Sequence, residues 1–157
     1  MEVAEETVEP IANELWFDGL ESEGFRIEKD PHVTLVPGYD ADAIPNLPDF
    51  TEPQPVEVSG IRCWPDIERP MVVMLDVSDD MLLNVWRDEI LAQIGKTTVE
   101  YDVAPPHVKL FKAGNSGDEQ DFAMDASVRN ELIERVDNVK TPSRIAITDI
   151  VRTSWEV

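Results

Sequence analysis

The chain contains only two histidines, His32 and His107, and both stand in the same short motif, Pro-His-Val-x-Leu. The first copy reads PHVTL at residues 31–35, and the second reads PHVKL at residues 106–110. The two histidines are 75 positions apart (107 − 32), which is about half of the 157-residue chain. This spacing predicts two copies of one supersecondary unit, each of which carries one histidine.

A pair of histidines can divide acid–base work, because imidazole gains and loses a proton near neutral pH. Cleavage of a phosphodiester needs a base for the attacking oxygen, an acid for the leaving oxygen, and donors that hold the phosphoryl oxygens. Residues two apart on a strand share a face, so Thr34 should accompany His32 and Lys109 should accompany His107. A hydroxyl and an ammonium group can both bind phosphoryl oxygens. The four residues form a candidate phosphoesterase site, and no obvious metal ligands accompany them.

The elements that must position these motifs follow from the spacing of apolar residues. Helical spacing predicts helices at 8–22, with Pro10 in a first turn, at 79–95, and around 128–138. Alternation or continuous apolar runs predict strands at 32–36, 55–64, 71–78, 97–103 and 107–111, and one strand or two short ones within 143–157. The acidic residues 1–9 are not expected to form a strand, and 37–55 is expected to be a long surface loop. This order of elements predicts an α+β fold.

Within the second motif strand, His107, Lys109 and Phe111 are expected on one face, with Val108 and Leu110 on the other. Trp86 belongs to the apolar stripe of the helix at 79–95 and is expected in the core. The single cysteine, Cys63, excludes a disulfide within the chain and is expected to fill a core position.

The two motifs and the order of the elements around them resemble the 2H phosphoesterase superfamily. This superfamily includes enzymes named 2′-5′ RNA ligases and 2′,3′-cyclic nucleotide phosphodiesterases. The resemblance covers most of the chain and implies a single domain over residues 1–157 with two pseudo-symmetric lobes. One lobe would comprise residues 1–60 and the C-terminal strands, and the other would comprise residues 61–140. Antiparallel sheets flanked by helices would carry the two motifs into a central cleft.

The resemblance also implies roles for the site residues. His32 and His107 would act as general base and general acid, in an order set by the direction of the reaction, and Thr34 would bind a phosphoryl oxygen. No metal ion or other cofactor would be required. The expected partner is an RNA end or a small, cyclic nucleotide with a 2′,3′-cyclic phosphate or a 2′-5′ linkage, and not duplex DNA. Independently of the resemblance, Tyr39 and Trp155 could stack on a base, as aromatic rings do in single-strand binders, or they could be packing residues.

An alternative is a 2H-fold module without turnover, which binds a nucleotide or serves as a structural part, for example of a virus particle. The superfamily has threonine or serine in its second motif where this chain has Lys109. The lysine either clamps a phosphate or marks a retired active site. Arg62, Arg69 and Lys112 are further cations that could attract an anion or could be ordinary ion-pair partners at the surface.

The chain has 33 acidic and 13 basic residues and a net charge of −20. With five lysines against eight arginines, this composition resembles the proteomes of extremely halophilic archaea and their viruses. A merely acidic mesophilic protein, or one that avoids nucleic acid, is the alternative. No apolar run approaches the ~20 residues of a membrane-spanning helix, and residues 1–10 lack the features of a secretory signal. We therefore expect a protein of a high-salt cytoplasm, or one associated with a virus.

The charge leads to a prediction about salt. Molar KCl shortens the screening length to about 3 Å, so the mutual repulsion of surface carboxylates should largely disappear. Thermal unfolding followed by circular dichroism should show the melting temperature rising from low salt to molar KCl. A melting temperature that does not depend on salt would remove the argument for a halophilic source.

Overall fold

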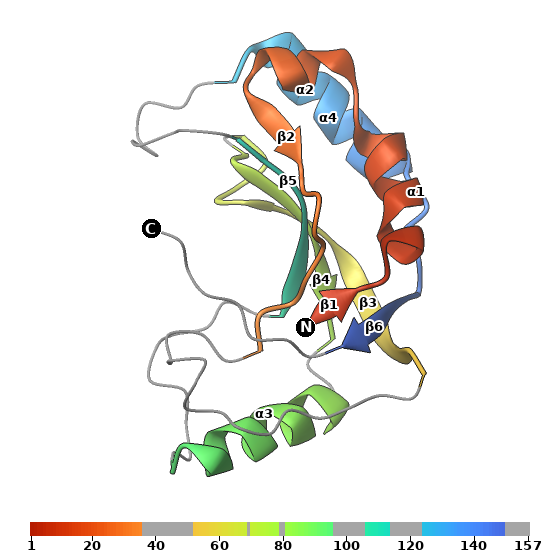
Figure 1. The fold of residues 1–157 in the computed structure, drawn as a ribbon. Helices are drawn as coiled ribbons and strands as arrows, with labels where there is room; N and C mark the ends of the chain where they lie inside the picture. The colour runs from red at the N-terminus through yellow and green to blue at the C-terminus, as the bar shows by residue number, and fades with distance from the viewer. Residues whose placement is uncertain (36–51, 69, 79–80, 96–105, 114–123, 150–157) are drawn as a thin grey trace.

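The structure is a computed structural model, and it describes residues 1–35, 52–68, 70–78, 81–95, 106–113 and 124–149 (Figure 1). These residues form an α+β fold, as the sequence predicted. In chain order the elements are β1 Glu2–Val3, α1 Glu5–Leu15, α2 Asp18–Ser22, β2 Phe25–Ile27, β3 Gln54–Trp64, β4 Val72–Val77, α3 Met81–Gln93, β5 His107–Ala113, α4 Ala126–Asn138 and β6 Arg144–Asp149.

The six strands form one curled, half-barrel sheet in the order β1-β6-β3-β4-β5-β2, with antiparallel pairing throughout. The long strand β3 joins two parts of this sheet, because Gln54–Glu57 pairs with β6 whereas Val58–Trp64 pairs with β4. Two lobes with separate sheets were expected. In the part of the chain that the structure describes, the shared strand β3 makes the sheet continuous, and no division into two lobes is seen.

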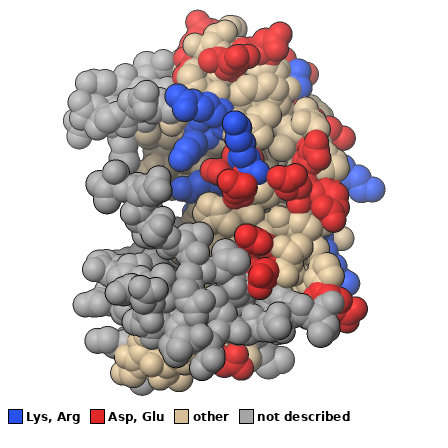
Figure 2. Space-filling model, viewed as in Figure 1, with Lys and Arg blue, Asp and Glu red and all other residues tan. Residues whose placement is uncertain are grey.

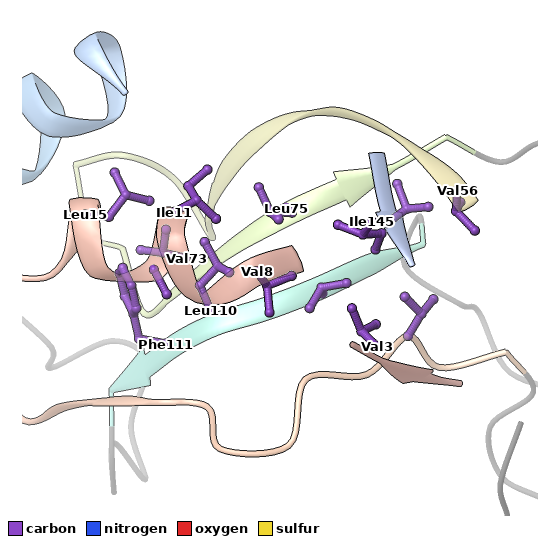
Figure 3. Close-up of a cluster of buried hydrophobic side chains, with 14 of the residues drawn as sticks. Val3, Val8, Ile11, Leu15, Val56, Val73, Leu75, Leu110, Phe111 and Ile145 are labelled. Carbon is purple, nitrogen blue, oxygen red and sulfur yellow. The ribbon is translucent and has the colours of Figure 1, made fainter. Parts of the chain in front are cut away.

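One face of the sheet carries the hydrophobic core (Figure 3). Helices α1, α2 and α4 cover this side of the sheet (Figure 1), and α1 contributes the buried side chains of Val8, Ile11 and Leu15. Every strand adds at least one fully or nearly fully buried residue to the same cluster: Val3, Phe25, Val56, Leu75, Val108 and Ile147. We call this side the core face and the opposite side of the sheet the polar face.

The N-terminal residues form a strand, so the expectation that they would not was wrong. Val3 pairs with Ile147 of β6, and its N–H donates to the carbonyl of Pro31 at 3.0 Å. The N–H of Val33 donates in turn to the carbonyl of Met1 at 2.8 Å. The strand is only two residues long, so one buried valine and these backbone partners suffice despite the acidic composition. It holds the first histidine motif against the sheet.

The predicted helix at 8–22 is two helices, α1 and α2, because the chain is extended at Trp16 and Phe17. Phe17 is buried, and the guanidinium of Arg135 lies 4.8 Å from the centre of its ring. Arg135 also donates to the carbonyls of Glu14 at 3.0 Å and Trp16 at 3.2 Å. These bonds satisfy carbonyls that the end of a helix leaves without a partner. Because α1 begins at Glu5, Pro10 lies inside it and not in its first turn.

The strands predicted at 55–64, 71–78 and 107–111 and the helices predicted at 79–95 and around 128–138 are confirmed, whereas the strand predicted at 32–36 is only an isolated bridge at His32. Strands β3 and β4 are neighbours, and β4 lies in the middle of the sheet. Helix α3 buries Leu83, Trp86 and Ile90 and is followed by Gly95 at a φ of 71°. Helix α4 ends at Asn138. The predicted strand at 97–103, most of the loop at 37–55 and the end of the terminal strand lie outside the described residues.

Strand β5 contains an irregularity that changes the direction of Phe111. Val73 of β4 pairs with Phe111, whereas the next residue, Met74, pairs with Lys109. Leu110 is therefore an extra, unpaired residue, as in a β-bulge, and the side chains after it change face. Leu110 and Phe111 are both buried, at 2% and 0% exposure. The expectation that Phe111 shares a face with His107 and Lys109 was wrong.

The inward position of Phe111 can be tested by truncation. Its ring also contacts the ring of Trp16, at 5.6 Å between centroids. Phe111→Ala should lower the free energy of unfolding by about 3–5 kcal/mol, the usual cost of removing a buried aromatic ring. Ile27→Ala is the matched control, because Ile27 pairs with Phe111 but is 40% exposed, and it should cost about 1 kcal/mol or less. Both free energies are measured by denaturant unfolding in molar KCl. Equal, small losses of unfolding free energy in the two variants would contradict the bulge.

Candidate functional site

The first motif lies beside β1, where His32 forms an isolated bridge with Glu2. Val33 and Leu35 are buried at 1% and 5% exposure, whereas His32 and Thr34 are exposed. The alternation confirms that His32 and Thr34 share a face, although only a single bridge forms where a strand was expected. Because Val33 belongs to the core cluster, His32 and Thr34 lie on the polar face.

His32 is oriented by a hydrogen bond to its own chain. Its Nδ1 lies 2.9 Å from the backbone carbonyl oxygen of Asp30. A carbonyl oxygen can only accept, so in the neutral ring Nδ1 carries the proton and Nε2 carries the lone pair. Nε2 is therefore the nitrogen that can accept a proton from a substrate or a water molecule.

The second motif lies on β5, next to the central strand β4. His107 pairs with Asp76, and Lys109 pairs with Met74. Both motif side chains are half-buried, and Val108 between them is fully buried in the core. His107 and Lys109 therefore lie together on the polar face, as predicted. Phe111, which was predicted to join them, does not.

An ion pair stands beside His107. Arg62 of β3 donates from Nη2 to Oδ1 of Asp76 at 2.9 Å and from Nε to the same oxygen at 3.1 Å. A further contact joins its Nη2 to the sulfur of Met74 at 3.3 Å. Both charged side chains are about one-third exposed or less. Arg62 could have been a free cation of the site or an ion-pair partner, and the structure shows the ion pair with Asp76. Arg69 lies outside the described residues.

The structure places both motifs on one face of one sheet, because Val33 and Val108 enter the same core cluster. In the strand order, β1, β6, β3 and β4 lie between the first motif and β5. A hollow of about 350 Å³ lies between β5, the segment 27–31 and α1, which covers the core face of the sheet. Its wall includes Pro31 of the first motif and Lys109 and Leu110 of the second, but neither histidine. The hollow therefore borders both motifs beside α1, but it is not a cleft that holds the two histidines.

Two residues that residue spacing did not single out also lie on the polar face, near the second motif. Arg26 of β2 pairs with Lys112 of β5, and Trp64 of β3 pairs with Val72 of β4. Their nearness depends on strand pairing between distant segments, which the order of residues along one strand does not reveal. Tyr39 and Trp155, the predicted stacking residues, lie outside the described residues.

Cys63 lies on the core face of β3, where it pairs with Val73 and packs against the core cluster, as expected. Burial raises the pKa of its thiol to about 11. The reactive form of cysteine is the thiolate, so this side chain is a poor nucleophile at neutral pH. Within the described ranges, no group of three or more His, Cys, Asp or Glu side chains could hold a metal ion.

Comparison with protein-family models finds no match to the chain, and a search among curated proteins finds no significant relative. Any assignment of a site therefore depends on the two motifs and on their geometry. Among the described helices, none is both long enough and apolar enough to cross a membrane.

The burial of Cys63 predicts slow chemistry at its thiol. In the folded protein at pH 8, reaction with Ellman's reagent should be much slower than in the denaturant-unfolded chain, because most of the thiol stays protonated and covered. The folded-state pKa of about 11 lies above the ordinary thiol value of 9.0, so rising pH should also destabilise the fold across that interval. Equal rates for the folded and unfolded chain at pH 8 would show that Cys63 is not buried.

Proposed function

We propose that the protein is a metal-independent phosphodiesterase of the 2H type. Its substrate would carry a 2′,3′-cyclic phosphate or a 2′-5′ linkage, in RNA or in a small nucleotide. The observation that carries this proposal is the repeated pairing of a histidine with a phosphate-binding side chain on the polar face, His32 with Thr34 and His107 with Lys109.

In this proposal His32 is the general base. Its Nδ1 is held by the carbonyl of Asp30, so Nε2 can remove a proton from the attacking water or hydroxyl oxygen. The attacking oxygen forms a bond to phosphorus. His107, in its protonated form, gives a proton to the oxygen that leaves as the old phosphorus–oxygen bond breaks. In the reverse direction the two histidines exchange these roles.

Thr34 and Lys109 would hold the phosphoryl oxygens as negative charge develops on them. A lysine is a flexible, compact charge, so it can follow the phosphate through the reaction but does not fix its geometry as a hydroxyl would. The neighbouring Arg62–Asp76 ion pair supports this arrangement, since Arg62 neutralises the carboxylate that stands next to His107. Without that ion pair, Asp76 would repel an anionic substrate.

The second candidate is a nucleotide-binding or structural module with the same two motifs but no turnover. The specific observation that favours it is Lys109, at a position where the superfamily uses threonine or serine. Such a module would bind a nucleotide stoichiometrically and leave it unchanged. One set of variants separates the two candidates.

The test uses His32→Ala and His107→Ala in molar KCl with EDTA present. A panel of 2′,3′-cyclic nucleotides and 2′-5′ oligoadenylates serves as substrates. Removal of a general acid or base usually costs 10²–10⁴-fold in rate, so each variant should lose activity by roughly that factor while the wild type is unaffected by EDTA. Matching circular dichroism spectra would show that the variants are folded.

A substrate control and a side-chain control accompany this experiment. A 3′-5′-linked oligodeoxyadenylate should not be cleaved, since it has no 2′ oxygen to attack the phosphorus or to leave from it. Glu134→Ala, an exposed change on α4, which covers the opposite side of the sheet, should leave turnover unchanged. Unchanged turnover in both histidine variants would overturn the proposal. Binding without turnover in the wild type would favour the second candidate.

A further inference from the structure

The strand register builds an ordered array on the polar face beside the second motif. Partners across strands share a face, so three rows can be read from the pairing. One row holds His107 and Asp76, and the next holds Lys109, Met74 and Arg62. The third row contains Trp64, Val72, Lys112 and Arg26, which come from β3, β4, β5 and β2 in that order. We call this third row the tryptophan row.

The tryptophan row places two exposed cations directly opposite each other. Arg26 and Lys112 are register partners, and like charges in such a pair destabilise a sheet. Neither side chain forms an ion pair or hydrogen bond with the described residues. Figure 2 shows basic side chains gathered beside β2 and β5, with acidic side chains next to them and over the right and upper parts of the described surface. In a chain with a net charge of −20, two facing cations without an ion-pair partner among the described residues need an explanation.

Among the described residues, no ion pair joins a carboxylate to Arg26 or Lys112, and two carboxylates of the neighbouring rows and segments have other positions. Asp76 lies two rows away from the tryptophan row and is bound by Arg62. Glu28 follows two residues after Arg26 and lies on the wall of the hollow that it shares with Lys109. An anion that binds at Arg26 and Lys112 would relieve their mutual repulsion.

The same row ends in an exposed aromatic ring. Trp64 is 39% exposed, and within the described residues only Ile27 and Val85 are other large hydrophobic side chains with comparable exposure. Its backbone is anchored, because its carbonyl accepts a hydrogen bond from the N–H of Met71 at 2.7 Å. An exposed tryptophan in one row with a pair of cations combines a stacking surface with phosphate-binding groups.

The tryptophan row lies at a defined distance from the proposed reaction centre. Val72 and Asp76 mark the two outer rows on β4 and are four residues apart, which is about 13 Å along a strand. If the reacting phosphate of a substrate lies at His107 and Lys109, the adjoining nucleotide of the same substrate can reach the tryptophan row.

We propose that the tryptophan row binds a base and a phosphate that adjoin the reacting group, so that the substrate is a single-stranded oligonucleotide and not a mononucleotide. Trp64 stacks on the base, and Arg26 with Lys112 binds the phosphate. The inference rests on the proposed function for its reaction, but the binding it describes can be measured without any turnover. Stacking and phosphate contacts read neither sequence nor sugar, so binding should tolerate different bases.

The binding test uses a fluorescein-labelled deoxyadenylate oligomer, which lacks the 2′-hydroxyl and is not cleaved. Fluorescence anisotropy gives its dissociation constant at a series of KCl concentrations at which the protein is folded. Trp64→Ala should weaken binding roughly 5- to 150-fold with little change in salt dependence, since stacking is not ionic. Arg26→Gln with Lys112→Gln should reduce the slope of log affinity against log salt by about 0.7 for each phosphate that the variant no longer neutralises.

Two control variants match these changes elsewhere on the surface. Val85→Ala removes an exposed apolar side chain from α3, and Lys140→Gln with Arg144→Gln removes two positive charges near α4 and β6. Neither should change the affinity or its salt slope. Wild-type affinity in the tryptophan-row variants, or equal weakening in the controls, would overturn the inference.

An activity measurement separates this inference from the proposed function. For an oligonucleotide that ends in a 2′,3′-cyclic phosphate, Trp64→Ala should lower kcat/KM, whereas for a cyclic mononucleotide it should not. Equal kcat/KM values for the two substrates in the wild type would overturn the inference and leave the proposed function standing. No turnover of either substrate, with binding still dependent on Trp64, would overturn the proposed function alone.

Discussion

The burial of Val33 and Val108 in one core determines the direction of the polar side chains in both motifs. Each valine is almost fully buried, at 1% and 0% exposure, and side chains alternate along extended backbone. His32, Thr34, His107 and Lys109 must therefore project from the opposite side of the same sheet. Turning either motif over would expose a buried valine and leucine and bury a histidine. The hydrophobic core thus maintains the arrangement on which any joint chemistry depends.

The central strands connect this constraint to the charge of the polar face. Strand β4 lies between β3 and β5, so its register decides which residues of those strands become neighbours. The register brings Arg62 to Asp76, beside His107, and it sets Lys112 in a row with Trp64. An acidic protein thereby gains a local surface on which cations are concentrated. The same strands therefore supply stability through one face and a surface with several cations through the other.

Sequence patterns predicted those parts of the structure that depend on local periodicity. The alternation in PHVTL and PHVKL correctly placed each histidine beside its polar partner, and the apolar run at 71–78 correctly indicated the central strand. The failures come from longer-range effects. The break at Trp16 and Phe17 depends on capping by Arg135, more than a hundred residues away. The change of face at Phe111 depends on one extra residue relative to β4, and β1 depends on partners in β6 and the first motif. Arg26 and Trp64 became candidates only through the cross-strand register.

The central claim is that two distant motifs form one site, and the rarity of histidine in this chain permits a direct measurement. Long-range ¹H–¹⁵N spectra of the two imidazole rings, assigned with His32→Ala, would be recorded during titration with adenosine 2′-monophosphate in molar KCl. A shared site predicts that the His32 ring starts with a protonated Nδ1 and that both rings shift with one common dissociation constant. A response of only one ring, or two unrelated dissociation constants, would show that the motifs do not share a site.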